Sequence, residues 1–104
     1  MSSDYLADVQ RYDWHADSDT VQRIVRHLGV ALRTRDAALV ACGDQTERVS
    51  VRQTWCMAKL GADDISRCDE AIARICEAMA GDGSKQRVTF YYLVARELGK
   101  LDAI

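Results

Sequence analysis

The stretch Ser84–Leu98, SKQRVTFYYLVAREL, predicts the helix on which the fold depends. Successive residues of a helix turn by about 100°, so Val88 and Tyr91 fall on one side of this helix and Phe90 on the other. A helix that is apolar nearly all round is normally enclosed by other helices. Its first residue can act as the N-cap, and Gly99 supplies a stop. The sequence therefore predicts a buried central helix near the end of the chain.

Length and composition predict one globular domain, residues 1–104. A chain of 104 residues is close to the commonest domain size. Its residues are 48% hydrophobic and 29% charged, and its net charge is −2. A dedicated binder of nucleic acid or of an anionic membrane usually carries a clear basic excess instead. Nucleic acid is therefore an unfavoured partner, although a local basic patch stays open.

The sequence favours a cytoplasmic protein. No apolar run approaches the ~20 residues of a membrane span, and the first residues, MSSDYLADVQ, lack the basic and apolar regions of a signal peptide. No membrane partner is expected. Because the cytosol keeps thiols reduced, the cysteines are expected as free thiols. There are four of them: Cys42, Cys56, Cys68 and Cys76.

The remaining apolar periodicity predicts further helices around the central one. Five longer helices are expected: from Ser3 or Asp4 to about Tyr12, from Asp17 or Ser18 to about Leu32 with a weak point at Gly29, from Asp44 to Leu60, from Ser66 to Met79, and Ser84–Leu98 itself. The apolar run at 37–42 fits a buried strand or a short helix. A short helix of two turns is expected, because no partner strand is visible. These elements predict an all-α, compact multi-helix bundle of five longer helices plus one short helix.

Five short segments resemble a family of small bacterial proteins that is catalogued only as a domain of unknown function. They are LVACGD at 39–44, AKLG at 58–61, AIARICE at 71–77, KQRVTFYYL at 85–93 and LGK at 98–100. Trp55 stands where the family usually has phenylalanine, and Cys56 where it usually has an aliphatic residue; both positions stay apolar. The resemblance implies a compact helical fold in the cytosol and implies no activity.

No arrangement of residues in the sequence points to catalysis, to a metal or to a cofactor. The cysteines form no C-x-x-C pair, and Cys68 and Cys76, about 12 Å apart along one helix, cannot bridge each other. A zinc site would need ligands from four separate segments. Cys42 is the least implausible nucleophile, but nothing supplies it with a base. The sequence favours cysteines that fill the core, no metal, no cofactor and no enzyme.

Two groups of basic residues are candidates for binding an anion or nucleic acid. Arg23, Arg26, His27, Arg33 and Arg35 cluster in and after the second predicted helix, and Arg48 and Arg52 lie on the polar face of the helix after Asp44. A helix, a short turn and a helix that bears arginine is typical of a groove reader. The net charge of −2 and Glu47 on the same face oppose this, and a solvated surface is the commoner explanation.

Lys85 and Arg87 form a third basic group, at the start of the central helix. Free amides at a helix start attract negative charge, so these side chains could help to hold an anion there. Their own positive charge is unfavourable at that end of the helix dipole. A carboxylate from elsewhere, such as Asp69 or Glu70, would relieve this repulsion, and such an internal pair is the commoner outcome.

Three aromatic residues suggest an interface. Trp55 lies on a different side of its helix from Cys56 and Leu60, and Tyr91 and Tyr92 add to an apolar surface larger than one face needs. Small helical proteins often complete their cores by pairing. The leading hypothesis is a non-catalytic interaction or structural protein that forms a homodimer and binds an unidentified protein partner. The alternative is an anion-binding or nucleic-acid-binding module, and an enzyme comes third.

Overall fold

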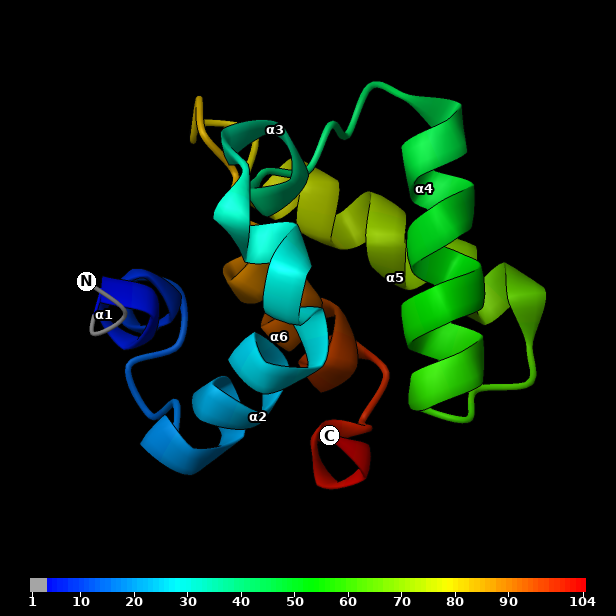
Figure 1. Cartoon of the computed structure of the whole chain (residues 1–104). Helices are drawn as coiled ribbons and strands as arrows, with labels where there is room; N and C mark the ends of the chain where they lie inside the picture. The colour runs from blue at the N-terminus through cyan, green and yellow to red at the C-terminus, as the bar shows by residue number, and fades with distance from the viewer. Residues whose placement is uncertain (1–3) are drawn as a thin grey trace.

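Helices form the regular structure of the computed structural model, which describes residues 4–104 (Figure 1). The α-helices in this range are α1 (Asp4–Gln10), α2 (Ser18–Leu28), α3 (Arg35–Ala38), α4 (Gln45–Val51), α5 (Ile65–Ala78) and α6 (Arg87–Glu97). Three more segments join or extend them: the 3-10 helix η1 (Gly29–Arg33), the π-helix η2 (Arg52–Lys59) and the 3-10 turn η3 (Leu101–Ala103). No β-strand forms within the described residues, and the predicted all-α class is confirmed.

Helix α6 is the centre of the fold, as predicted. Every residue from Val88 to Ala95 is buried, and helices α1, α2, α3 and α5 all pack against it. Figure 1 shows α6 behind α2, with α1 on one side and α5 on the other. No helix within residues 4–104 is both long enough and apolar enough to cross a membrane.

The segment before α6 is extended, although the sequence pattern predicted a helix from Ser84. The helix begins at Arg87 rather than at Ser84, because the Ser84 amide donates to Oδ1 of Asp82 at 3.0 Å in a turn. Gln86 then forms an isolated bridge with Leu39, and the amide of residue 40 donates to the carbonyl of residue 85 at 2.8 Å. The predicted N-cap at Ser84 is therefore wrong.

The same bridge shortens the predicted helix at 37–42. Thr34 caps α3 by accepting from the Ala37 amide, and the helix ends at Ala38. Leu39 is already extended, with φ −112° and ψ 153°. The two-turn helix is wrong in its second half, because the partner of this segment lies far along the sequence at Gln86.

Helix α2 ends at its glycine. Asp17 caps it by accepting from the Thr20 amide at 3.1 Å, and Gly29 has φ 49°, a conformation that side chains with a Cβ rarely adopt. The chain continues to Arg33 as a 3-10 helix instead of an α-helix. The predicted weak point at Gly29 is where the α-helix stops.

The predicted helix from Asp44 to Leu60 is present, but its second half is wider than an α-helix. Asp44 caps α4 by accepting from the Thr46 amide at 2.9 Å. From Arg52 onward the hydrogen bonds span five residues, for example from the Leu60 amide to the Trp55 carbonyl at 2.9 Å. Such π turns are rare and redirect the residues that follow them.

Two other helix ends differ from the predictions. Asp64, not Ser66, caps α5 by accepting from the Arg67 amide at 3.1 Å. The first helix ends at Gln10, before Tyr12, and the alternative first residue Ser3 lies outside the described residues. Asp and Ser both cap helices well, and at α5 the structure uses the aspartate.

The three aromatic residues that suggested an interface are buried within the single chain. Trp55 is 0% exposed, Tyr91 5% and Tyr92 3%. The Trp55 indole donates from Nε1 to the Tyr91 carbonyl at 3.0 Å and its ring stacks on Tyr91 with centroids 4.6 Å apart. Tyr92 donates to Oδ2 of Asp13 at 2.9 Å. The prediction of these residues at an interface is wrong, because Trp55 and Tyr91 pack against each other within the chain and Tyr92 is buried with its hydroxyl on Asp13.

Candidate anion-binding cleft

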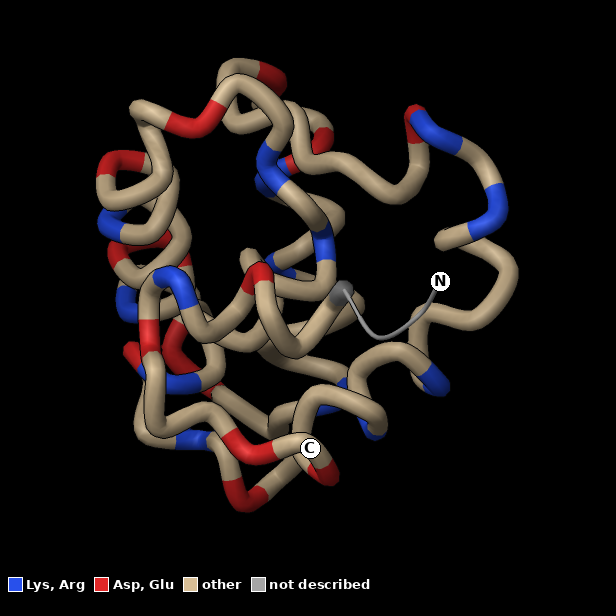
Figure 2. Tube along the Cα trace, turned by 90° about the vertical axis from the view of Figure 1, so that its left-hand side faces the viewer, with Lys and Arg blue, Asp and Glu red and all other residues tan. Residues whose placement is uncertain are grey.

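Basic residues are spread over the surface rather than gathered in one region. Figure 2 shows positively and negatively charged residues interspersed along the trace on the face it presents. Which basic side chains can bind a ligand therefore depends on which already have partners inside the protein.

Arg87 is committed to the fold. Its guanidinium donates to the carbonyls of Ala37 at 2.6 Å and Leu39 at 3.0 Å, and to Oε1 of Glu47 at 2.6 Å. The side chain is only 11% exposed, and it lies over the ring of Tyr91. Arg87 thus joins α3, α4 and α6, and its carboxylate partner is Glu47 rather than the predicted Asp69 or Glu70.

Three further candidates also have partners in the protein. Arg48 donates from Nε to the Cys42 carbonyl at 2.7 Å, and Lys85 donates from Nζ to the carbonyl of Asp82 at 3.1 Å. Arg52 donates to both carboxylate oxygens of Asp69 at 3.1 Å. Helices α2 and α4 are joined by residues 29–44, which include η1 and α3, so the short turn expected for a groove reader is not formed.

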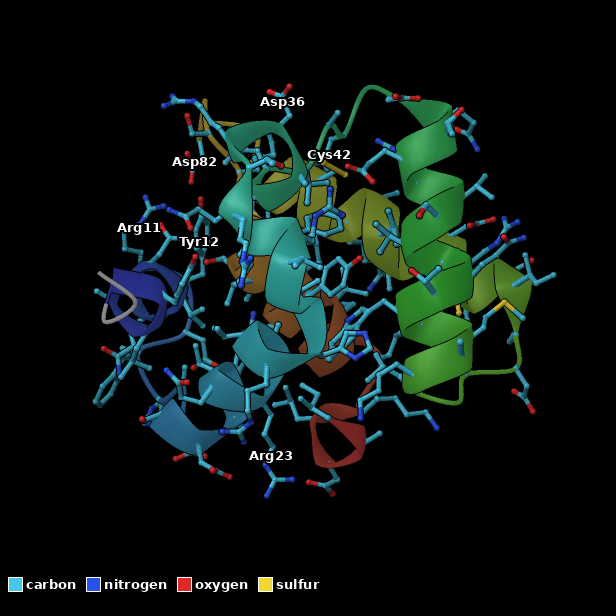
Figure 3. The ribbon with its side chains drawn as sticks, viewed as in Figure 1. Arg11, Tyr12, Arg23, Asp36, Cys42 and Asp82 are labelled. Atoms are coloured by element: carbon cyan, nitrogen blue, oxygen red, sulfur yellow. A yellow bond between two sulfur atoms is a disulfide. The ribbon has the colours of Figure 1, made fainter. Side chains whose placement is uncertain are left out.

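A different set of basic side chains lines a surface cleft of about 410 Å³. Helix α2 contributes Arg23, Arg26 and His27. Lys59 is the last residue of η2, and Ile104 closes one side of this α2–η2 cleft. Among residues 4–104, the charged side chains that line this cleft are all basic. Figure 3 shows Arg23 beside the final turn of the chain, where its Nη1 donates to the main-chain oxygen of Ile104 at 3.3 Å.

The sequence of α2 explains why its three basic residues share a face. Residues three and four apart in a helix are neighbours on its surface, so Arg23, Arg26 and His27 lie together. Val21 and Ile24 are buried and turn the opposite side of α2 toward the core. The basic face is therefore fixed toward solvent.

His27 comes to the cleft from α2 and Lys59 from η2. The imidazole of His27 lies against the buried Trp55, with ring centroids 5.2 Å apart. Partial burial lowers the pKa of His27, and the positive charge of Lys59 lowers it further. A bound anion would favour protonation of His27, because it would offset the repulsion between the imidazolium and Lys59.

Part of this cleft could be predicted from the sequence. Arg23 and Arg26 are candidate binding residues there, and His27 belongs to the same basic cluster. Lys59 was missed, because the π turns of η2 set its position and no sequence signal marked them. Arg33 and Arg35 are exposed on η1 and α3, outside the lining of the cleft.

The cysteines divide into two pairs. Cys42 and Cys76 form a disulfide with Cα atoms 5.8 Å apart, so the prediction of four thiols that fill the core is wrong for this pair. Cys56 and Cys68 are free and buried, as expected. Burial raises the pKa of Cys56 to about 12, which makes it an unreactive thiol. Among the described residues, no three of the His, Cys, Asp and Glu side chains gather as metal ligands.

Residues 4–102 match the protein family described as Protein of unknown function (DUF2853). The match spans nearly all of the chain, so the chain belongs to this family, and the resemblance seen in the sequence is confirmed. No curated protein matches the chain.

Proposed function

We propose that this member of the DUF2853 family is a non-catalytic binding module that holds the phosphate group of a small ligand in the α2–η2 cleft. The observation that carries the proposal is the convergence of Arg23, Arg26, His27 and Lys59 from two separate segments on one depression in whose lining, among residues 4–104, no acidic side chain lies. Guanidinium groups bind phosphate through paired N–H donors, and lysine adds a point charge.

The size and charges of the cleft suit such a ligand. Its volume of about 410 Å³ lies within the usual range for small-molecule sites, roughly 300–1,000 Å³. Arg23 pairs with Asp19 at 3.0 Å, but both side chains are more than half exposed. An exposed pair of this kind contributes only about 0–1 kcal/mol, so a doubly charged anion can compete with Asp19 for Arg23.

The proposal is tested by titrating the protein with inorganic phosphate at constant ionic strength while recording amide NMR spectra. The shifts should centre on residues 23–27 and on Lys59. The Arg26→Gln and Lys59→Gln variants should bind phosphate about tenfold more weakly, the effect of losing one charge-assisted contact. Arg33→Gln removes the same charge from an exposed residue outside the cleft and should bind as the unmodified protein does. Equal weakening in Arg33→Gln would refute the proposal.

Nucleic-acid binding is the alternative use of the basic residues. Arg33 and Arg35 lie on the elements that follow α2 and are exposed, which favours a longer polyanion. The net charge of −2 and the interspersed acidic residues oppose it. Fluorescence polarisation with a short single-stranded oligonucleotide separates the two cases. Salt-sensitive binding that Arg33→Gln and Arg35→Gln weaken as much as Arg26→Gln does would favour nucleic acid.

Homodimer formation and a protein partner stay predictions. The aromatic residues that suggested pairing are buried, and the large apolar side chains most exposed among the described residues are Trp14 at 75%, Val30 at 71% and Ile65 at 51%. Sedimentation at several concentrations tests pairing: a monomer throughout rules it out. A cytoplasmic location and a bacterial source also stay predictions. The Cys42–Cys76 disulfide counts against a strongly reducing compartment.

A further inference from the structure

A second depression, of about 590 Å³, exposes the disulfide to solvent. The segment between α3 and α4, where Figure 3 labels Cys42, forms one wall, and the last turns of α5 with Cys76 form another. Cys42 is partly exposed, whereas Cys76 is 6% exposed. An incoming group therefore meets Cys42 first.

Charged side chains of both signs surround this disulfide. Arg48, Arg74 and Lys85 line the depression together with Glu70 and Glu77. Arg74 also pairs with Glu97 at 3.0 Å. Arg48, which donates to the Cys42 carbonyl, and Lys85, whose carbonyl accepts from the amide of residue 40, are the cations of the lining that contact the segment 39–42. A ligand that carries carboxylates and an ammonium group would find a partner for each charge here.

We propose that this depression binds a small thiol that carries carboxylate and ammonium groups, of the glutathione class, and that the thiol forms a mixed disulfide with Cys42. Its carboxylates face Arg48 and Lys85, and its ammonium faces Glu70 or Glu77. The volume falls within the usual range for small-molecule sites, roughly 300–1,000 Å³.

The reaction is an ordinary thiol–disulfide exchange. The incoming thiol loses its proton to solvent, and its thiolate attacks Sγ of Cys42. A sulfur–sulfur bond forms between the ligand and Cys42, the Cys42–Cys76 bond breaks, and the electron pair leaves with Cys76, which takes a proton from solvent. The ligand sulfur is oxidised to the disulfide level and Cys76 is reduced, so no other oxidant is required. Attack by the Cys76 thiolate on Cys42 reverses the step.

The fold around Cys42 can tolerate this exchange. Arg48 holds the Cys42 carbonyl at 2.7 Å, Arg87 holds the Leu39 carbonyl at 3.0 Å, and the amide of residue 40 donates to residue 85 at 2.8 Å. These bonds keep the segment 39–42 in place after the disulfide opens. Cys56 and Cys68 are 0% exposed and do not compete for the thiol.

The test incubates the oxidised protein with reduced glutathione, alkylates the remaining thiols and maps the products by peptide mass spectrometry. Glutathione is expected on Cys42 and the alkyl group on Cys76. The rate of mixed-disulfide formation is measured with glutathione and with uncharged 2-mercaptoethanol. Each rate is divided by the rate at which the same thiol reacts with a small linear disulfide, which removes the difference in intrinsic reactivity. Glutathione should then react about tenfold faster, which corresponds to one charge-assisted contact.

Three variants separate recognition from simple reactivity. Lys85→Gln should lower the preference for glutathione. Glu77→Gln should leave it equal or lower, because the ammonium group faces Glu70 or Glu77. Arg33→Gln removes a charge outside the depression and should leave the preference unchanged. Circular dichroism confirms that each variant is folded. The proposal is overturned if Cys42 and Cys76 are found as thiols before treatment, if glutathione is found on Cys76, or if the normalised rates of the two thiols are equal.

Discussion

Arg87 and the α2–η2 cleft use the same kinds of basic side chain for opposite purposes. Arg87 is 11% exposed and has two carbonyls and a carboxylate within hydrogen-bond distance. In the cleft, the side chains of Arg23, Arg26, His27 and Lys59 face solvent, and among residues 4–104 no acidic side chain lies in the lining. Arg23 pairs there with the exposed Asp19 and with the main-chain oxygen of Ile104. The first arrangement stabilises the protein, whereas the second leaves donors within reach of a ligand.

A cluster of basic residues in a sequence therefore does not identify a binding site by itself. Lys85 and Arg87 are close neighbours at the start of the central helix, yet Arg87 is saturated by partners from two distant segments. A buried arginine needs such partners, because an unpaired buried charge is costly. An exposed arginine needs none, so only the structure separates the two groups.

The largest expected effect follows from breaking the Arg87 network. Arg87→Met leaves the Glu47 carboxylate, 18% exposed, without its partner and frees two carbonyls. Removing one member of a buried pair typically costs about 3–5 kcal/mol of the free energy of unfolding, which urea denaturation measures. Arg87→Met combined with Glu47→Leu should recover part of that loss. A loss below about 1 kcal/mol in the single variant would show that Arg87 is no structural link.

Reducing the disulfide should have the next largest effect. The bridge closes a loop with a sequence separation of 34, and bridges of that kind typically contribute about 2–4 kcal/mol to the free energy of unfolding. The Cys42→Ser/Cys76→Ser variant should lose a comparable amount and still bind inorganic phosphate normally, because the disulfide lies outside the cleft. Loss of phosphate binding in a variant that remains folded would contradict the separation of the two regions.

Variants of the cleft should change binding and leave stability nearly unchanged. Arg26→Gln and Lys59→Gln remove exposed charges, and such surface changes usually shift the free energy of unfolding by less than about 0.5 kcal/mol. Phosphate affinity should fall about tenfold in each. Urea denaturation and an NMR titration on the same samples provide both values. A large loss of stability in either variant would make the cleft structural, like the Arg87 network.

The smallest expected effect is a dependence of anion affinity on pH. The pKa of His27 lies below its usual value, and a bound anion favours the protonated imidazole. Affinity for sulfate, which stays fully ionised, should therefore rise as the pH falls through the pKa of His27. This rise should be absent in His27→Gln. A pH profile that His27→Gln leaves unaltered would exclude His27 from the site.

The same residue predicts a change of stability with pH. In the folded protein His27 resists protonation, whereas in the unfolded chain it takes up a proton at the usual imidazole pKa. The unfolded state thus binds more protons between the two pKa values, so the free energy of unfolding falls as the pH decreases through that window. Above the usual pKa His27 is neutral in both states and contributes no dependence. Comparing wild type with His27→Gln in urea isolates this contribution.

Much of the fold could be predicted because it depends on local patterns. The apolar residues on all sides of 84–98 predicted a buried α6, and Gly29 predicted the weak point at which α2 ends. The Leu39–Gln86 bridge and the Cys42–Cys76 disulfide were missed, since each joins segments far apart in the sequence. The expectation of a reducing compartment also argued against any disulfide. The sequence predicts Trp55 as surplus apolar surface, because spacing along one helix does not show that Trp55 packs against Tyr91 of another helix.

The candidate site could be predicted only in part, for the same reason. Arg23 and Arg26 are a local feature of α2, and spacing alone places them on one face. Lys59 lies at the end of η2, whose π turns no sequence pattern predicted. Conversely, Arg52 looked available from spacing, but its acceptor Asp69 belongs to another helix. Arg48 lines the depression beside the disulfide rather than this cleft, and its Nε donates to the Cys42 carbonyl.

The central claim is that the basic side chains divide into a structural group and a binding group. The Arg26→Gln/Lys59→Gln double variant tests it most directly, through phosphate affinity and urea denaturation of the same preparation. The account predicts that phosphate affinity falls by about a hundredfold, because the binding free energies of the two lost contacts add. The free energy of unfolding should stay within about 1 kcal/mol of wild type. Unchanged phosphate binding in a folded double variant would contradict it.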